Sequence, residues 1–139
     1  MTNLVERDDA ISLHMAGWWP TLLIGDNLPP MTKKEPEFIR LTVLEGEGFL
    51  ARRTGILNVT GSVIRHPVSL YFDVYTKINN DTRRNGQLCQ SVIDHWYPVD
   101  LTPSFHLYES SGVERIGEEK PRFHQRVIIS GFRDERKRV

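Results

Sequence analysis

Cysteine is almost absent from this 139-residue sequence, which contains only Cys89. A single cysteine excludes an intramolecular disulfide framework and any cysteine-rich zinc site. It favours synthesis in a reducing cytoplasm. Residues 1–9 also lack the apolar stretch that a secretory signal peptide requires.

The sequence also lacks a net charge, because 18 Lys and Arg residues balance 18 Asp and Glu residues. This balance argues against a protein that binds nucleic acid by neutralising phosphates, so we expect no specific nucleic-acid partner. It also gives little electrostatic protection against self-association.

Long hydrophobic runs are the third absence. The longest run, Trp18–Ile24, is interrupted by Pro20 and Thr21 and is much shorter than the ~20 residues of a membrane span. We therefore expect no membrane partner. The length and the 39% hydrophobic content predict a single globular domain over residues 1–139.

Two segments have helical spacing of apolar residues. The first helix is expected to begin after Asn3, with Glu6 completing a capping box, and to end at Gly17. Its predicted apolar stripe consists of Leu4, Ile11, Met15 and Trp18. A second amphipathic helix is predicted over Arg84–Trp96, before Pro98.

The rest of the chain has mainly the two-residue period of strands. Residues 39–43 and 68–76 alternate most clearly; in the second run Ser69, Tyr71, Asp73 and Tyr75 are expected on a half-wet face. A β-hairpin-like insertion is predicted over Phe49–Val63, including a strand at Gly55–Thr60, and a C-terminal hairpin over Phe105–Ile116 and Arg122–Phe132. A loop is expected over 25–36 and a frayed tail over 133–139. These patterns predict an α+β fold, a mainly antiparallel sheet with two helices packed on one face.

No pattern of catalytic or metal-binding residues emerges. Gly46-Glu47-Gly48 follows a strand, but no helix follows to hold a phosphate, so we expect a β-turn or a hairpin tip. His106 and His124 lie on the two hairpin strands and could meet across them, but one such pair is a weak indication of a metal site. Cys89 is expected to be a buried apolar residue. The sequence thus predicts no enzyme, no metal and no cofactor.

Basic pairs suggest one other kind of function. Arg52-Arg53 and Arg83-Arg84, with Tyr71 and Tyr75, form a pattern compatible with a small β-rich module that binds single-stranded nucleic acid. Acidic neighbours favour the alternative, that these arginines are solvated or lie at an interface.

The order of segments resembles the tail-terminator (tail-completion) family of long-tailed bacteriophages. The resemblance rests on the first helix, on Ile24-Gly25-Asp26-Asn27-Leu28-Pro29-Pro30, on the strand Phe38–Gly46, on Arg65–Tyr75 and on the helix and hairpin that follow. The chain departs from the family in the insertion Phe49–Val63 and in Pro67. A related neck protein is the alternative.

This resemblance implies a non-enzymatic virion protein of the tail and neck, made in the bacterial host cytoplasm. Such proteins form a homo-hexameric ring that caps the tail tube, stops its growth and joins the head-tail connector. A head-completion or stopper protein, one ring nearer the head, is the runner-up. The candidate interface residues with other subunits or with the tail tube protein are Arg40, Arg52, Arg53, Arg65, Tyr71 and Tyr75.

Overall fold

The computed structural model describes residues 1–18, 37–52, 62–77, 82–119 and 122–136. In chain order its elements are α1 (Leu4–Ala16), β1 (Phe38–Glu45), β2 (Phe49–Arg52), β3 (Val63–Lys77), α2 (Thr82–Trp96), β4 (Val99–Thr102), β5 (Phe105–Glu119) and β6 (Arg122–Arg136). The expected loop at 25–36 and the expected strand at Gly55–Thr60 lie outside the described residues.

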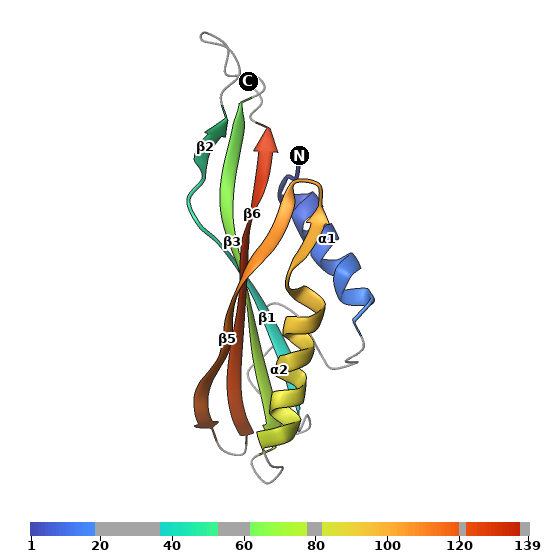
Figure 1. Cartoon of the computed structure of the whole chain (residues 1–139), viewed down its shortest axis with the longest axis vertical. Coiled ribbons are helices and arrows are strands. Elements are labelled where there is room, and N and C mark those ends of the chain that lie inside the picture. Colours follow the sequence, from blue (N-terminus) through green and yellow to red (C-terminus); the bar gives the residue numbers. More distant parts are fainter. Residues whose placement is uncertain (19–36, 53–61, 78–81, 120–121, 137–139) are drawn as a thin grey trace.

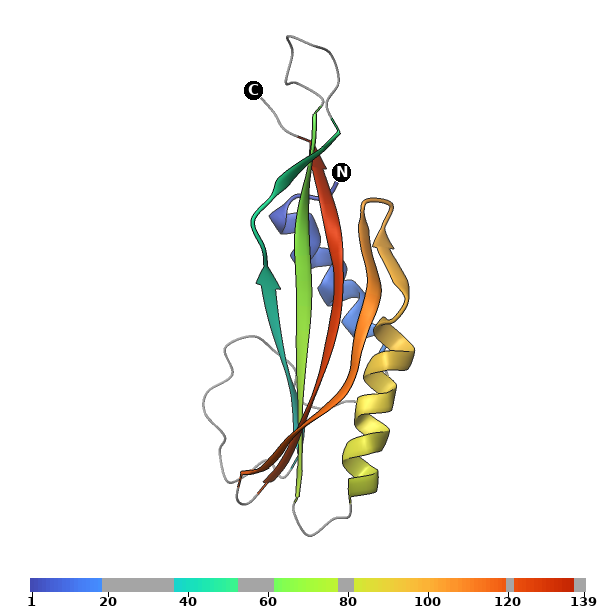
Figure 2. The ribbon, with the colours of Figure 1, turned by 60° about the vertical axis from the view of Figure 1, so that its left-hand side comes forward.

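The strands form one antiparallel sheet in the order β1-β3-β6-β5-β4, with β2 also paired to β3 (Figure 1). Both helices lie on the same face of this sheet (Figure 2). The predicted fold class is therefore confirmed, including the C-terminal hairpin and the hairpin-like pairing of β2 with the beginning of β3.

Strand β3 is an inner strand of the sheet and pairs with β1, β2 and β6. All of its 15 residues pair with β6, from Val63 opposite Arg136 to Lys77 opposite Arg122, without a register shift. Its inward side chains Leu70, Phe72 and Val74 are fully buried, as are Val127 and Ile129 of β6. The predicted apolar stripe of α2, Leu88, Val92, Ile93 and Trp96, is confirmed: three of these residues are fully buried and Ile93 is partly buried against the core. Cys89 is buried beside them.

The capping box of α1 is present as predicted. The Glu6 backbone N–H donates to Asn3 Oδ1 at 2.9 Å, and the Asn3 backbone N–H donates to the Glu6 carboxylate. The prediction for Leu4 is wrong, because this side chain is 50% exposed. One turn further on, Arg7 donates to Glu45 of β1, so polar groups of the sheet, and not its apolar core, face this part of the helix.

The predicted hairpin tip at Gly46–Gly48 is also wrong. β1 and β2 both pair antiparallel with β3, so residues 46–48 interrupt what is otherwise one continuous edge. The break lies beside Pro67, whose carbonyl accepts from the Gly46 N–H at 2.8 Å but which has no N–H to return a bond. A Cβ on Gly48 would lie 2.6 Å from the His66 ring, so a side chain at this position would have to displace that ring.

The expected frayed tail is wrong for residues 133–136, whereas 137–139 lie outside the described residues. β6 continues to Arg136, and Arg133 is only 2% exposed. Its guanidinium donates to Glu45 of β1 and to the carbonyl of Thr2, and it pairs with Glu135 at 3.0 Å. Although burial raises the pKa of Glu45, hydrogen bonds and charge from Arg133 and Arg7 hold it below its usual value. Arg133 thus connects β6 to the N-terminal segment through a hydrogen bond and to β1 through an ion pair.

The C-terminal ends of the two helices are joined by a pair of histidines. Nε2 of His14 donates to the His95 carbonyl at 2.6 Å, and Nε2 of His95 donates to the His14 carbonyl at 2.7 Å. Their rings stack with centroids 4.1 Å apart, beside Trp18 and Trp96. Burial lowers the pKa of His14, and the charge of the nearby His95 ring lowers this pKa further. The hydrogen bond to the His95 carbonyl raises it but does not compensate, so the pKa of His14 lies below 6.5.

This pair predicts a loss of stability in mild acid. The fold favours neutral His14, so its contribution is complete above the unfolded-state pKa of 6.5 and decreases as the pH falls toward the lower folded-state value. We expect the melting temperature to decrease between pH 7.5 and 5, and His14→Gln to reduce this decrease. Thermal unfolding followed by circular dichroism measures both; equal slopes for the two proteins would contradict the prediction.

A second prediction concerns Gly131 of β6. A Cβ at this position would lie 1.7 Å from the carbonyl oxygen of His106 in β5, so the strands must separate to accept a side chain. We expect Gly131→Ala to reduce the free energy of unfolding by about 3 kcal/mol or more. Gly86→Ala in α2 is the control: no atom lies within 4 Å, and alanine should stabilise the helix by up to about 1 kcal/mol. Urea unfolding of both variants would show changes of opposite sign.

Candidate interaction face

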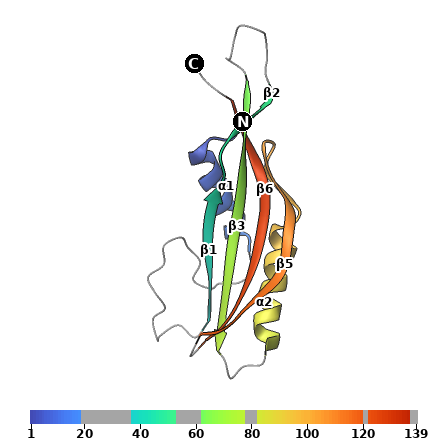
Figure 3. The same ribbon diagram turned by 90° about the vertical axis from the view of Figure 1, so that its left-hand side faces the viewer.

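The sheet has a second face, turned away from α1 and α2, which we call the distal face (Figure 3). Alternation along each strand assigns residues to it, since Leu70, Phe72 and Val74 point toward the helices. Arg40, Arg65, Tyr71 and Tyr75, which the sequence singled out separately, all lie on this face.

These four residues do not form one cluster. Arg40, Tyr71 and Tyr75 lie in the half of the sheet near Lys77, whereas Arg65 lies ten residues from Tyr75 along β3, about 33 Å at the usual strand rise. The backbone of Arg52 in β2 pairs with that of Val63 in β3. Arg53 lies outside the described residues.

Asp73 is the charged centre of the distal face. Its side chain is 8% exposed and accepts from His124 Nε2 at 2.7 Å and from Arg126 Nε at 2.8 Å. Burial raises the pKa of Asp73, but the hydrogen bonds and positive charge of His124 and Arg126 outweigh burial and hold the pKa below its usual value. Asp73 is therefore an ionised carboxylate whose Oδ1 accepts from both neighbours.

Tyr75 belongs to a row of stacked rings beside Asp73. Its ring lies 4.6 Å from Phe38 of β1 and 4.2 Å from His124 of β6, centroid to centroid. The expectation that Tyr75 and Asp73 lie on a half-wet face is wrong, because both residues are only 6% exposed. Neighbouring strands cover them with rings and a guanidinium, whereas Tyr71 remains half-buried with Arg126 over its ring.

Arg65 anchors the other end of the distal face. It donates twice to Asp134, at 2.9 and 3.0 Å, and its guanidinium lies 3.7 Å above the Phe132 ring. The pKa of Arg65 is raised, chiefly by the Asp134 hydrogen bond. Its side chain remains 36% exposed, so Arg65 is accessible although it is paired.

Next to Phe132, three polar side chains form a surface cluster. His106 stacks on Tyr108, and both bond to Asp100 of β4, the histidine at 2.6 Å through Nδ1. Hydrogen bonds from Tyr108 and His106 lower the pKa of Asp100, and the pKa of Tyr108 is raised in turn. His124 lies opposite Gly117 and not near His106, so the suggested histidine pair is wrong.

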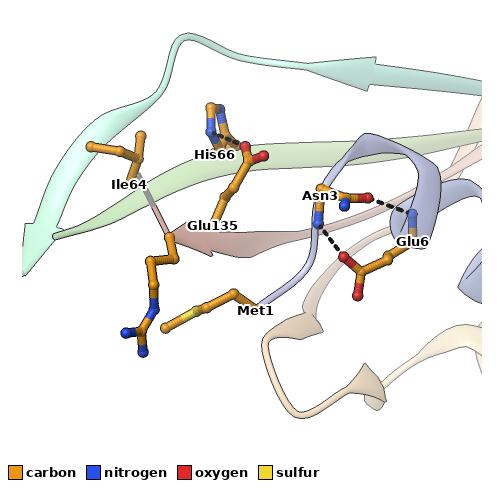
Figure 4. A pocket seen from close by; sticks show the side chains of 7 residues that line it. Met1, Asn3, Glu6, Ile64, His66 and Glu135 are labelled. Atoms are coloured by element: carbon orange, nitrogen blue, oxygen red, sulfur yellow. Dashed lines mark hydrogen bonds and ion pairs between the residues drawn. The ribbon is translucent and has the colours of Figure 1, made fainter. Parts of the chain in front are cut away.

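On the helical side, a pocket of about 630 Å³ lies beyond the N-terminus of α1 (Figure 4). Its lining includes His66 and Glu135, which pair with each other at 3.4 Å, and Asn3 and Glu6, which form the capping box. The remaining lining residues are Met1, Ile64 and Arg136. His66, Glu135, Asn3 and Glu6 already have partners, and Arg136 is exposed, so we assign no ligand to the pocket.

The described residues contain no group of three His, Cys, Asp or Glu placed to hold a metal ion. The thiol of Cys89 is buried, and burial raises its pKa to about 12, so it is not a reactive nucleophile in this position. Within the same described residues, no helix combines the length and apolar character needed to cross a membrane.

Sequence reasoning missed the residues that organise the distal face. Asp73, His124 and Arg126 are distant in sequence and meet only through the β3–β6 register. The available signal was Asp73 itself, an acidic residue in the middle of a strongly alternating strand. A buried carboxylate requires cationic or hydrogen-bonding partners, but its position in the sequence does not identify those partners.

Comparison with known proteins establishes only the fold. No protein-family model and no curated protein matches the sequence. One solved structure, whose title states no function, matches with a TM-score of 0.58 and 12% identity, over 95% of this chain and 98% of that chain. The two chains share an architecture over nearly their whole lengths.

Asp73→Asn tests the charged centre. Removing one member of a buried ion pair leaves its partners without charge compensation, so we expect a loss of about 3 kcal/mol in unfolding free energy at pH 7. The folded-state pKa of Asp73 is lowered, so its contribution is complete above the unfolded-state value of about 3.9 and is lost as the pH falls through the folded value.

Urea unfolding at pH 7, 5 and 3 measures the difference between the two proteins. It should be constant from pH 7 to 5 and shrink toward pH 3. Asp8→Asn is the matched control, because Asp8 is a 63% exposed partner of Arg7 and should contribute at most about 1 kcal/mol. An equal effect of both substitutions would contradict a buried, ionised Asp73.

Proposed function

We propose that this protein is a tail-terminator-type structural protein of a long-tailed bacteriophage. In this role it forms a ring on the head-proximal end of the tail tube, ends tube polymerisation and forms the joint to the head connector. Its place of action is the virion tail and neck, after synthesis in the host cytoplasm. The observation that carries the proposal is the family-like order of segments together with a distal face rich in arginines and aromatic rings.

The arrangement of charges supports an assembly role. A ring subunit contacts two neighbours through different surfaces, and complementary pairs at such contacts set the register more than the affinity. This chain has no net charge, and its distal face alternates acidic and basic groups, with Arg126 beside Asp73 and Arg65 beside Asp134. Of the candidate residues, Arg40, Arg65 and Tyr71 stay partly accessible on this face and remain the proposed contacts.

The proposal does not include catalysis or nucleic-acid binding. Arg65 and Arg126 are neutralised by carboxylates, and Tyr75 is buried between two rings, which disfavours a basic stacking platform for bases. A stopper protein, one ring nearer the head, would use the same kind of surface. It differs in the assembly step that fails without it.

Light scattering over a concentration series tests ring formation. We expect a discrete species of about 97 kDa, six chains of 16.1 kDa each. A monomer at every concentration would contradict a ring that forms before the tail is met. A mobility shift of single-stranded oligonucleotides at micromolar protein and moderate salt would instead support the nucleic-acid module.

Deletion of the gene in its phage tests the role directly. Over-long or unjoined tails are expected for a tail terminator. Finished tails beside leaking, filled heads would indicate a stopper protein. Tails of normal length with heads attached would overturn both.

A further inference from the structure

A row of charges crosses the distal face from one edge of the sheet to the other. Arg40 of β1 lies opposite Asp73 of β3, Asp73 lies opposite Arg126 of β6, and Arg126 lies opposite Glu114 of β5. The signs alternate along this row, and Arg126 donates to Asp73 at 2.8 Å. The row therefore begins with a positive charge at one edge and ends with a negative charge at the other.

The strand directions at the two edges are also complementary. Each neighbouring pair in the order β1-β3-β6-β5 is antiparallel, so β1 and β5 run in opposite directions. A second copy placed beside the first in the same orientation would thus bring its β1 antiparallel to β5. Among the described residues, no strand pairs with the outer edge of β1, and β4 reaches β5 only at Phe105–Leu107.

Bulges restrict where β5 can accept a further strand. Register shifts lie on both sides of Val113–Arg115, between Ser110 and Val113 and between Arg115 and Gly117. Phe105–Leu107 and Gly117–Glu119 also pair regularly with β6, but the first of these stretches is already paired with β4. Glu114 is at the centre of the window Val113–Arg115. Val113 is 46% exposed and Glu114 is exposed. Bulges bend a strand and interrupt its ladder, so they limit an added strand to a short stretch of regular pairing here.

We propose that the edge window Val113–Arg115 of β5 pairs antiparallel with β1 of a second copy of this chain, with Glu114 beside Arg40 of that copy. This inference rests on the proposed ring function and names the contact that closes the ring. An arginine has five N–H donors, so Arg40 accommodates Glu114 in addition to the groups that it already contacts.

Charge disfavours the symmetric alternatives. A two-fold pairing of β5 with β5 through Val113–Arg115 places Glu114 opposite its own copy, and a two-fold pairing of β1 with β1 centred on Arg40 does the same for Arg40. Like charges placed opposite each other destabilise a strand pair. The β5–β1 contact joins two different edges, so it is repeated from copy to copy and ends when the rotation closes.

Two charge reversals test the contact by light scattering. Glu114→Lys alone and Arg40→Glu alone each create a like-charge contact at every interface, and each should raise the midpoint concentration of assembly by about tenfold or more. An equimolar mixture should restore the wild-type mass, because alternating copies then pair Lys with Glu and Glu with Arg. Single variants that assemble like wild type, or a mixture that stays dissociated, would overturn the contact.

Matched controls separate assembly from folding. Glu109→Lys makes the same charge change on β5 outside the window and should leave assembly unchanged. Circular dichroism and thermal unfolding of each variant establish that the monomer is folded, which is needed because Glu114 and Arg40 adjoin Arg126 and Asp73 in their own chain.

Cysteine cross-linking tests the same contact where association is weak. In Arg40→Cys/Glu114→Cys, oxidation should give a ladder of covalent multimers, whereas each single variant should give none; buried Cys89 remains silent. Absence of the ladder at several hundred micromolar protein, or cross-linking of a single variant, would overturn the edge contact. If gene deletion gives over-long tails but the double variant forms no ladder, only this contact is overturned. If gene deletion leaves tails of normal length joined to heads, the proposed function is overturned, even if the ladder forms.

Discussion

The pairing of β3 with β6 is the contact on which the rest of the structure depends. Fifteen residue pairs run without a shift, and they determine which side chains point to the helices and which point to the distal face. A slip by one residue would exchange the two faces of the strand. The apolar core under α2 and the charged row through Asp73 and Arg126 are therefore two results of a single register.

Both faces of this strand pair contain a buried charge with several partners. Arg133 lies on the helical side and is held by Glu45, Glu135 and the Thr2 carbonyl, whereas Asp73 lies on the distal side and is held by His124 and Arg126. Each cluster joins elements that are distant in sequence. A buried ion is tolerated when hydrogen bonds replace the lost water, so these clusters contribute to a unique arrangement of strands only as complete sets.

Local patterns predicted the elements, and long-range partners explain the errors. Asn3 and Glu6 define the start of α1, and strict alternation identifies the middle of β3, because these signals need only neighbouring residues. The composition of residues 133–139 resembled a frayed tail, yet Arg133 is buried by Glu45, which lies 88 residues away. The strand β4 was missed because it has only four residues. Of the candidate interface residues, Tyr75 is covered by Phe38 and His124, which no local pattern indicates.

The position of β6 in the sheet has a consequence for the order in which the protein can fold. It is the last described strand in the chain, but it lies between β3 and β5, and its partners in β3 are 45 to 73 residues earlier. Closing loops of that length costs entropy before any pairing repays it, which makes such sheets slow to form. Among the described strands, β6 alone pairs with that side of β3, so this part of the sheet closes only after β6 has left the ribosome.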